Sequence, residues 1–229
     1  VSIMPCTAKK FEIGREDQAA SGYPDTDVAL TTRELAKMIK RAGINFTELA
    51  DEEFDAPLGI GSGAGTIFGA TGGVMEAALR TAVETITGKP AEKLEFTDVR
   101  GTDGIKEAEY DVAGKKIKVA IASGTKNAKV LMDQIKNGTS EYLFIEIMGC
   151  PGGCINGGGQ PYVKPIFLEN EGFDILETYR AKRAAVLYSE DEKQVLRQSH
   201  RNPDIIKLYD EFLGKPGSEL AEELLHTSY

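Results

Sequence analysis

Short segments in which apolar residues alternate with polar ones, or run together, predict β-strands along the first two thirds of the chain. These segments are residues 1–5, 27–30, 94–99, 107–112, 117–122 and 142–148. Between the fourth and the fifth of them, Ala113-Gly114-Lys115 has the composition of a hairpin turn. The pattern therefore predicts a sheet built from short strands.

Apolar residues spaced three and four apart predict helices elsewhere. The first helix is expected to begin at an N-cap formed by Thr31 or Thr32 and to stop at Gly43. Further helical patterns, one of them a single turn, cover residues 45–50, 66–87 and 127–135. The second of these is interrupted by glycines, and residues 59–65 are so rich in glycine that we predict a tight loop there.

Beyond residue 165 the strand pattern ceases. Three helical patterns rich in charge follow one another, at residues 173–188, 203–213 and 218–225, and their acidic faces are expected to be solvated. We therefore predict an α/β lobe over residues 1–165, with a small, mostly parallel sheet flanked by helices. An all-helical C-terminal extension is predicted over residues 166–229.

Composition narrows the class of protein. The formal net charge of −9 argues against nucleic-acid binding, because a phosphate backbone requires a basic surface. No apolar run approaches the roughly 18 residues of a membrane span, and the first residues lack the basic and apolar regions of a signal peptide. With few cysteines, this pattern predicts a cytoplasmic, reducing environment and no membrane span.

The three cysteines lie in two motifs flanked by glycine and proline. Cys6 follows the first predicted strand, and Cys150 and Cys154 follow the strand predicted at 142–148. Loops at the carboxyl ends of strands are where open α/β sheets place their functional groups. Three thiols cannot all pair as disulfides, but they could supply three of the four thiolates that an iron–sulfur cluster requires. The count points to a metal site with one ligand outside this chain.

Other interpretations of these residues stay open. Cys6 alone could be a small buried hydrophobe, and Cys150 with Cys154 could form a redox disulfide or half of a zinc site. The two histidines, His200 and His226, show no paired spacing.

Two neighbouring features bear on the chemistry of the motifs. Lys9 could direct a cation at an anionic ligand, and the glycines at 157–159 could permit close approach of a bulky cofactor. Glycines near Cys150 could also aim backbone N–H groups at sulfides. The loop at 59–65 lacks the Gly-Lys-Ser/Thr ending of a nucleotide-binding loop, so a phosphate site there is disfavoured.

At these motifs the sequence resembles the catalytic domain of the iron-only (FeFe) hydrogenases. The resemblance is carried by Met4-Pro5-Cys6-Thr7-Ala8-Lys9-Lys10, similar to the family's second cluster signature, and by Glu146-Ile147-Met148-Gly149-Cys150-Pro151-Gly152-Gly153-Cys154, similar to its third. Several other stretches are also similar to the family. They are residues 31–35, 62–65, 67–80 and 104–108, the glycine run ending in Gln160-Pro161, and short C-terminal stretches at 187–188, 199–200 and 224–226. The resemblance therefore spans essentially the whole chain.

This resemblance implies an H-cluster, a 4Fe–4S cubane joined through a cysteine sulfur to a diiron unit that bears CO and cyanide. On that basis Cys6, Cys150 and Cys154 ligate the cubane, and Cys154 bridges to the diiron unit. Lys9 would donate to a cyanide of the distal iron. The residues expected to pack around the diiron unit are Met4, Pro5, Phe68 and Met148. The implied reaction is reversible reduction of protons to H2.

The family's first signature, a Cys-Cys pair in a Thr-Ser-Cys-Cys-Pro-Gly-like loop, is not in this sequence. That loop would supply the fourth cubane thiolate and the thiol that shuttles protons. We therefore expect this chain to be the C-terminal portion of a catalytic domain, inactive alone and completed by an N-terminal half in cis or as a separate chain. Smaller departures are Gly149, where alanine is commoner, and the approach to Ser62.

A redox partner such as ferredoxin or a nicotinamide-linked subunit is also implied. The main alternative is a hydrogenase-like iron–sulfur protein without H2 chemistry, acting as a sensor, scaffold or assembly factor. Such relatives are expected to lose Lys9, Met4 and Met148, so the presence of these residues favours the catalytic interpretation. A plain electron-transfer subunit is a weaker alternative, because it would not explain the long similarity at residues 67–80.

Overall fold

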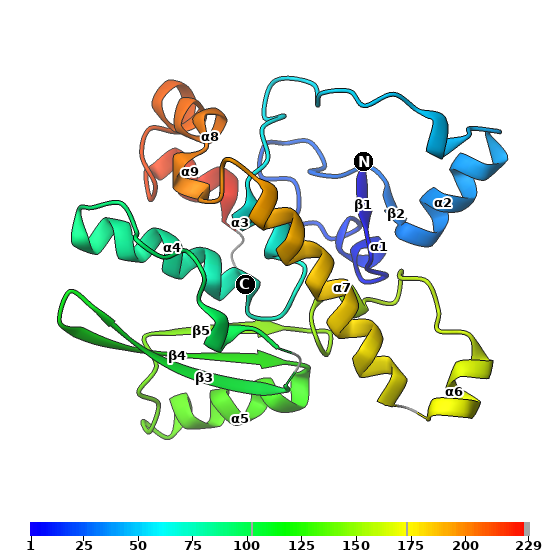
Figure 1. Cartoon of the computed structure of the whole chain (residues 1–229). Helices are drawn as coiled ribbons and strands as arrows, with labels where there is room; N and C mark the ends of the chain where they lie inside the picture. Colours follow the sequence, from blue (N-terminus) through cyan, green and yellow to red (C-terminus); the bar gives the residue numbers. More distant parts are fainter. Residues whose placement is uncertain (102, 173, 227–229) are drawn as a thin grey trace. The chain divides into compact units, whose positions relative to one another are not determined.

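The computed structural model describes residues 1–101, 103–172 and 174–226 (Figure 1). The described chain divides into two compact units, each assembled from separate segments. Unit 1 contains residues 1–60, 157–162 and the part after residue 200, and unit 2 contains residues 61–156 and 163–200. Each unit is described by itself.

Unit 2 is organised around a three-stranded sheet with the order β3-β4-β5. Strands β3 (Ile105–Val112) and β4 (Lys115–Ser123) form the predicted hairpin, and both residues of its turn, Ala113 and Gly114, have positive φ. That left-handed backbone suits a two-residue hairpin loop. Strand β5 (Phe144–Met148) pairs with β4 in parallel through the crossover helix α5 (Thr125–Lys136).

The two faces of β4 are covered by different helices, α4 (Gly73–Thr87) on one side of the sheet and α5 on the other (Figure 1). Alternate residues explain this arrangement, because successive side chains of a strand point to opposite faces. Val119 and Ile121 pack in a cluster with Met75 of α4, whereas Ala120 packs with Leu131 of α5. The period-two pattern of the sequence therefore corresponds to two buried faces.

The predicted mostly parallel single sheet is only partly confirmed. The described residues form two small sheets, a parallel pair in unit 1 and the mixed three-stranded sheet of unit 2. The hydrophobic pattern specifies that a segment is a strand, but it does not specify which neighbour the strand pairs with or in which direction.

The strand predicted at residues 94–99 was wrong. The segment contains a 3₁₀ turn, Thr97–Val99, outside the sheet. Its backbone is bound by side chains instead of a neighbouring strand, since the Leu94 carbonyl accepts a hydrogen bond from Arg80 and the Phe96 amide donates one to Glu76. An apolar segment whose backbone groups find such partners does not need a strand pairing.

The glycine-rich loop predicted at 59–65 was wrong in its second half, because helix α3 (Gly63–Ile67) begins there. The Ser62 hydroxyl caps this helix by accepting a hydrogen bond from the Gly65 amide at 3.2 Å. A Cβ atom at Gly63 would lie 2.0 Å from an Asp191 carboxylate oxygen. Glycine is therefore present for close packing as well as for turning the chain.

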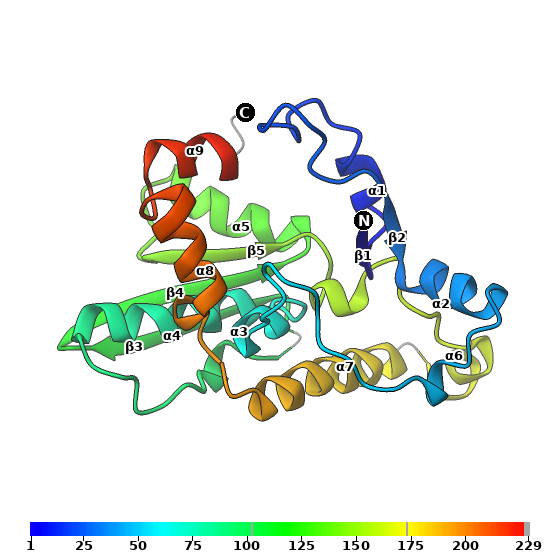
Figure 2. The same ribbon diagram turned by 90° about the horizontal axis from the view of Figure 1, so that it is seen from above.

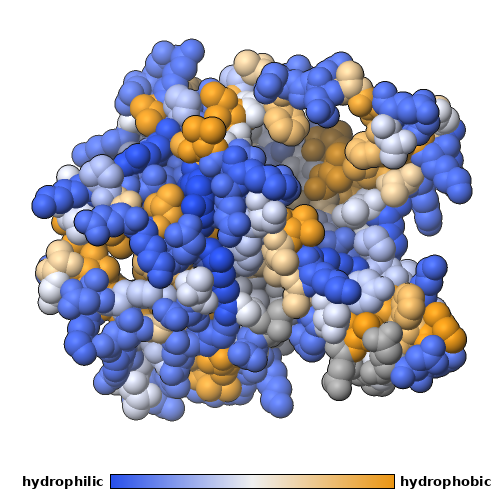
Figure 3. Space-filling view, viewed as in Figure 1, coloured by the Kyte–Doolittle hydropathy of each residue, from blue (hydrophilic) through white to orange (hydrophobic). Residues whose placement is uncertain are grey.

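Helices cover the rest of unit 2. α6 (Pro165–Glu171) is followed by α7 (Asp174–Lys193). The predicted helix 173–188 starts at a residue that lies outside the described residues. Figure 2 shows α7 lengthwise with α3 beside it, and the two helices are in contact. Most of the visible face of unit 2 is hydrophilic, with separate hydrophobic patches (Figure 3).

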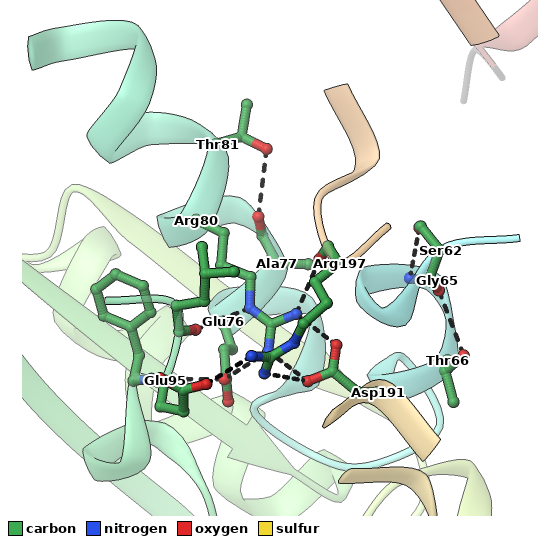
Figure 4. A network of polar contacts seen from close by, with 12 residues as sticks. Ser62, Gly65, Thr66, Glu76, Ala77, Arg80, Thr81, Glu95, Asp191 and Arg197 are labelled. Carbon is green, nitrogen blue, oxygen red and sulfur yellow. Dashed lines mark hydrogen bonds and ion pairs between the residues drawn. The ribbon is translucent and has the colours of Figure 1, made fainter. Parts of the chain in front are cut away.

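A buried network of charges fastens α7 to α4 (Figure 4). Arg80 of α4 has no exposed side-chain surface and donates to both carboxylate oxygens of Asp191, at 2.7 and 2.8 Å, and to Glu76 at 2.9 Å. Arg197 joins Asp191 to Glu95, and Arg100 joins Glu76. Three carboxylates thus face three guanidinium groups, so each charge of this network has an opposite partner.

Unit 1 contains the parallel pair β1 (Ser2–Met4) and β2 (Ala29–Thr31), with α1 (Lys9–Glu12) and α2 (Thr32–Arg41). The predicted N-cap of α2 is confirmed at Thr31, which forms a capping box with Glu34. The turn predicted at 45–50 is a 3₁₀ turn, Phe46–Glu48.

The C-terminal part of the described chain is helical, as predicted. In unit 1, α8 (Pro203–Leu208) continues into a π-helical turn, Tyr209–Leu213, and α9 (Glu219–Leu225) follows. None of the helices in the described residues combines the length and apolar character that a membrane span requires.

Candidate functional site

The first cysteine motif leaves the end of a parallel strand in unit 1. β1 ends at Met4, and partly exposed Pro5 and Cys6 follow it directly. The Pro5 carbonyl accepts a hydrogen bond from the Gly159 amide at 3.2 Å. A Cβ atom at Gly159 would lie 3.0 Å from the Cys6 nitrogen, and one at Gly158 would lie 3.0 Å from the Thr7 hydroxyl. Gly158 and Gly159 therefore pack closely against the Cys6 motif.

This contact changes the interpretation of residues 157–159. The sequence predicted that their missing side chains could admit a cofactor, but in unit 1 the close neighbours of Gly158 and Gly159 are protein atoms, the Thr7 and Thr31 side chains and the Pro5–Cys6 backbone. Arg33 of α2 holds the run in place by donating to the carbonyls of Gly158 at 2.8 Å and Gln160 at 2.5 Å. Arg33 was missed as a positioning residue, although it lies in one of the stretches that carry the family resemblance.

The lysines of α1 have carboxylate partners in unit 1. Lys9 is about one third exposed and forms an ion pair with Glu12 of the same helix. Lys10 donates to the Ala29 carbonyl at 2.9 Å and pairs with Glu34 at 2.9 Å. The pKa of Glu34 is lowered to about 2, chiefly by the hydrogen bond from the Thr31 backbone and then by Lys10. Glu12 was not predicted as the partner of Lys9.

The second cysteine motif leaves the end of β5 in unit 2. Cys150 lies two residues beyond Met148, the last residue of the strand, and Cys154 begins a 3₁₀ turn. Between them, Gly152 and Gly153 adopt positive φ values of 81° and 94°. Glycine adopts this left-handed backbone without the strain that a side chain brings. The two thiols are therefore presented by a tightly turned loop.

The segment just before α4 holds this loop. The Thr71 amide donates to the Gly152 carbonyl at 3.1 Å, and the Ile155 amide donates to the Gly69 carbonyl at 3.0 Å. A Cβ atom at Gly153 would approach the Thr71 nitrogen to 2.6 Å, so no other residue fits without a shift. Arg183 of α7 donates to the Ile155 carbonyl at 3.0 Å and adds a third element to the support.

The backbone amides of this loop have acceptors within the protein. The Gly152 amide donates to the Ser123 hydroxyl at 3.3 Å, and the Gly153 amide donates to the Cys150 carbonyl at 3.0 Å. The expectation that these glycine amides are aimed at cluster sulfides is therefore wrong for Gly152 and Gly153. Their hydrogen bonds shape the loop instead.

The remaining predicted residues are partitioned between the two units. Met4, Pro5, Cys6 and Lys9 belong to unit 1, and Phe68, Met148, Cys150 and Cys154 belong to unit 2. Phe68 lies between α3 and α4 and is 44% exposed, while Met4 and Met148 are partly exposed at the ends of β1 and β5. The structure thus assigns each group of four to one unit.

The donor set fits thiolate ligation of an iron–sulfur group. All three cysteines are partly exposed, and in the described residues none of them is part of a disulfide. The described part of the chain contains no group of three or more His, Cys, Asp or Glu side chains that could hold a metal ion. The thiols therefore occur as a pair in unit 2 and a single residue in unit 1. A pair of thiols on a glycine loop is a partial ligand set.

Comparison with known families gives two matches that together cover most of the chain. The family described as "Iron only hydrogenase large subunit, C-terminal domain" matches residues 1–158. The family described as "Iron hydrogenase small subunit" matches residues 177–229. The first match ends at residue 158, and the second begins within α7.

Individual relatives agree with this assignment. The chain is 50% identical to the NADP-reducing hydrogenase subunit HndD of Solidesulfovibrio fructosivorans, covering 100% of this chain and 37% of the relative. It is 48% identical to iron hydrogenase 1 of Clostridium pasteurianum, covering 100% and 39%. The chain therefore spans about two fifths of the length of these curated relatives.

A solved structure shares the fold. A variant of the FeFe-hydrogenase HydA1 from Chlamydomonas reinhardtii matches with a TM-score of 0.74 and 41% identity, covering 100% of this chain and 62% of that one. A more distant relative is the cytosolic iron-sulfur assembly component 3 of Mus musculus, 29% identical over 100% of this chain and 47% of the relative.

Proposed function

The chain belongs to the iron-only hydrogenase family, and from that membership we propose that it is the portion of a catalytic domain that binds the H-cluster for the reversible reduction of protons to H2. The observation that carries the proposal is the Cys150–Cys154 loop, where two partly exposed thiols are held on a glycine turn at the end of a parallel strand. Thiolates in this setting are the ligands that iron–sulfur clusters take.

On this proposal Cys6, Cys150 and Cys154 would ligate the cubane, and the sulfur of Cys154 would also bridge to the diiron unit. When bound, the H-cluster would pass on electrons delivered by a redox partner and provide the iron at which protons are reduced. The chain's own part in that chemistry is to hold thiolates at fixed positions and to exclude water. The rigid support of the loop by Thr71 and Arg183 suits the first task.

Four apolar side chains would serve the second task. They are Met4, Pro5, Phe68 and Met148, and all of them retain exposed surface that a bound group could cover. Covering them would remove water from the site and strengthen the electrostatic interactions inside it. Lys9 would hold its cation towards a bound anion, and Glu12 would orient the ammonium group by the ion pair along α1.

The proposed partners are an N-terminal half carrying the fourth thiol ligand and the proton-shuttle cysteine, in cis or as a second chain, and a redox partner. The redox partner would be a ferredoxin or a nicotinamide-linked subunit, consistent with the name of the NADP-reducing relative. The cytoplasmic location inferred from the sequence stays a prediction.

Infrared spectroscopy in the CO and cyanide region tests the proposal. The sample is the chain together with its upstream half, co-expressed with the maturation proteins under anaerobiosis. The expected result is a set of CO and cyanide bands that Cys154→Ala abolishes and Gly149→Ala retains, because a Cβ atom at residue 149 meets nothing within 4 Å. Retained bands in Cys154→Ala would contradict the assignment of the bridging thiol.

Lys9 has a matched control next to it. Lys9→Ala is expected to reduce diiron incorporation, whereas Lys10→Ala removes the same charge from a side chain already bound to Ala29 and Glu34. Equal band intensity in the two variants would count against the role of Lys9.

A second candidate function is an iron–sulfur assembly factor or scaffold without H2 chemistry. The 29% identity to an assembly component supports this alternative. The higher identity to hydrogenases, 48–50%, favours the first proposal. The infrared experiment separates them, because an assembly factor would contain iron and sulfide and show no CO or cyanide bands.

A further inference from the structure

One peptide group next to the cysteine loop is bound at both ends by buried charged side chains. The carbonyl of Thr71 accepts a hydrogen bond from the Lys106 ammonium at 3.0 Å, and the adjoining Gly72 amide donates to the Glu146 carboxylate at 2.6 Å. Lys106 is 8% exposed and Glu146 is 5% exposed. Two charges buried on opposite ends of the same peptide group fix its orientation.

The two side chains come from one row across the sheet of unit 2. Lys106 of β3 is in register with Ile121 of β4, and Ile121 is in register with Glu146 of β5. Residues in register on neighbouring strands present side chains to the same face. The cation and the carboxylate therefore flank a fully buried isoleucine and reach the same segment in front of α4.

Glu146 also replaces the missing cap of α4. The residue at the N-cap position is Gly72, which has no side chain to accept a hydrogen bond from the first turn. One Glu146 oxygen accepts from Gly72 and the other from Met75 at 2.7 Å, so both oxygens bind amides that the helix leaves without partners. The negative charge also lies at the positive end of the helix dipole.

Burial opposes both charges, and local interactions compensate. Burial lowers the pKa of Lys106 to about 8, against the attraction of Glu146 and Asp103. Burial likewise raises the pKa of Glu146, against its hydrogen bonds from Gly72 and Met75. Lys106 also donates to the Gly101 carbonyl at 2.8 Å, so its ammonium group binds two carbonyl oxygens.

The bound peptide group is joined directly to the Cys150–Cys154 loop. Thr71 contributes its carbonyl to Lys106 and its amide to the carbonyl of Gly152, within the loop. Two residues earlier, the Gly69 carbonyl accepts from Ile155, the residue after Cys154. A shift of residues 69–72 would therefore change the anchor points on both sides of Gly153, whose backbone already lies against Thr71.

We propose that Lys106 and Glu146 are positioning residues for the Cys150–Cys154 loop, acting through the Thr71–Gly72 peptide group. The inference rests on the proposed function only in treating the loop as a cluster-binding element. The proposed role of the pair is structural, and it takes no part in the reaction itself. Its effect is to keep residues 69–72 in the conformation that accepts and supports the loop.

The test compares the cofactor-free full chain with Glu146→Gln and Lys106→Met. Each variant removes one charge at nearly constant volume. The matched controls are Glu109→Gln and Lys116→Met, an exposed ion pair on the same hairpin with N···O 2.8 Å. Hydrogen exchange is followed on peptides covering 69–75 and 150–156, and alkylation rates are followed for each cysteine by mass spectrometry.

We expect exchange in those two peptides to accelerate about tenfold in both variants, because a buried hydrogen-bond partner is lost. Alkylation of Cys150 and Cys154 should accelerate while that of Cys6, in unit 1, stays unchanged. Unchanged loop exchange in both variants would overturn the proposal. So would an equal acceleration over the loop, the β3–β4 hairpin and Cys6, since that pattern indicates general destabilisation.

A second measurement separates this inference from the proposed function. Iron and sulfide binding by the unaltered protein with its upstream half tests the function, whereas the exchange data concern the chain without a cofactor. If Glu146→Gln fails to fold, Lys106→Met still decides the proposal, because it removes the carbonyl anchor and leaves the cap of α4 in place.

Discussion

The buried charge network predicts a large and specific loss of stability when Asp191 is replaced by alanine. The Asp191 side chain has no exposed surface, and its two oxygens accept hydrogen bonds from Arg80 and Arg197 at 2.7–2.8 Å. Burial opposes its ionisation, yet these hydrogen bonds hold the pKa of Asp191 below its usual value. The carboxylate is therefore charged and paired in the folded chain.

The size of the effect follows from what the substitution leaves behind. Arg80 stays completely buried and keeps its hydrogen bonds to Glu76 and to two carbonyl oxygens. It loses the Asp191 carboxylate, which accepts two of its hydrogen bonds. Removing one member of a buried ion pair costs about 3–5 kcal/mol, because the other charge is left without compensation. Since whole domains are stable by only about 5–15 kcal/mol, this is a large fraction of the total.

The assay is urea unfolding followed by far-ultraviolet circular dichroism. Asp133→Ala is the matched control, because Asp133 pairs with Lys129 at 2.6 Å on the surface, with side chains 51% and 72% exposed. Its expected cost is at most about 0.5 kcal/mol. Asp191→Asn keeps the shape of the side chain against Gly63 and isolates the contribution of charge. Equal costs for Asp191→Ala and Asp133→Ala would refute the reasoning.

Three further predictions concern other parts of the chain. Thr31→Ala should destabilise α2 by about 1 kcal/mol through loss of its capping box, measured by thermal unfolding. Gly153→Ala should increase hydrogen exchange of the cysteine loop, while Gly149→Ala, which meets nothing within 4 Å, should not. Stability should rise by about 3 kcal/mol between about pH 8 and 10.5, because the unfolded chain holds the Lys106 proton over that interval and the folded chain does not. Lys106→Met should remove this rise in urea titrations.

Much of the local structure could be predicted because it depends on neighbours in sequence. The hairpin at Ala113-Gly114, the cap at Thr31 and the break in the helical pattern at 66–87 each follow from adjacent residues. The strand predicted at 94–99 failed for the opposite reason. Its backbone partners are Arg80 and Glu76, 14 and 20 positions away in the chain, and no local pattern indicates a side chain that will replace a strand.

The same distinction applies to the candidate site. The cysteines and their placement after β1 and β5 could be read from the motifs, and the family matches agree with them. Lys106 and Glu146 could not be assigned a role, because their shared register across three strands exists only in the folded sheet. Glu146 stood within the motif that carries the resemblance, yet nothing in its sequence position indicates that it caps α4.

The two cysteine motifs are built in the same way, although they belong to different units. Each follows a parallel strand, each has a glycine backbone packed against it, and each has an arginine donating to nearby carbonyls: Arg33 to Gly158 and Gln160, and Arg183 to Ile155. Cationic side chains and close backbone packing therefore set the positions of the thiols. Because the amides of Gly152 and Gly153 already donate to the Ser123 hydroxyl and the Cys150 carbonyl, they are not available to stabilise charge on a bound sulfide. The chain's contribution to a cluster should accordingly depend on where the thiolates are held.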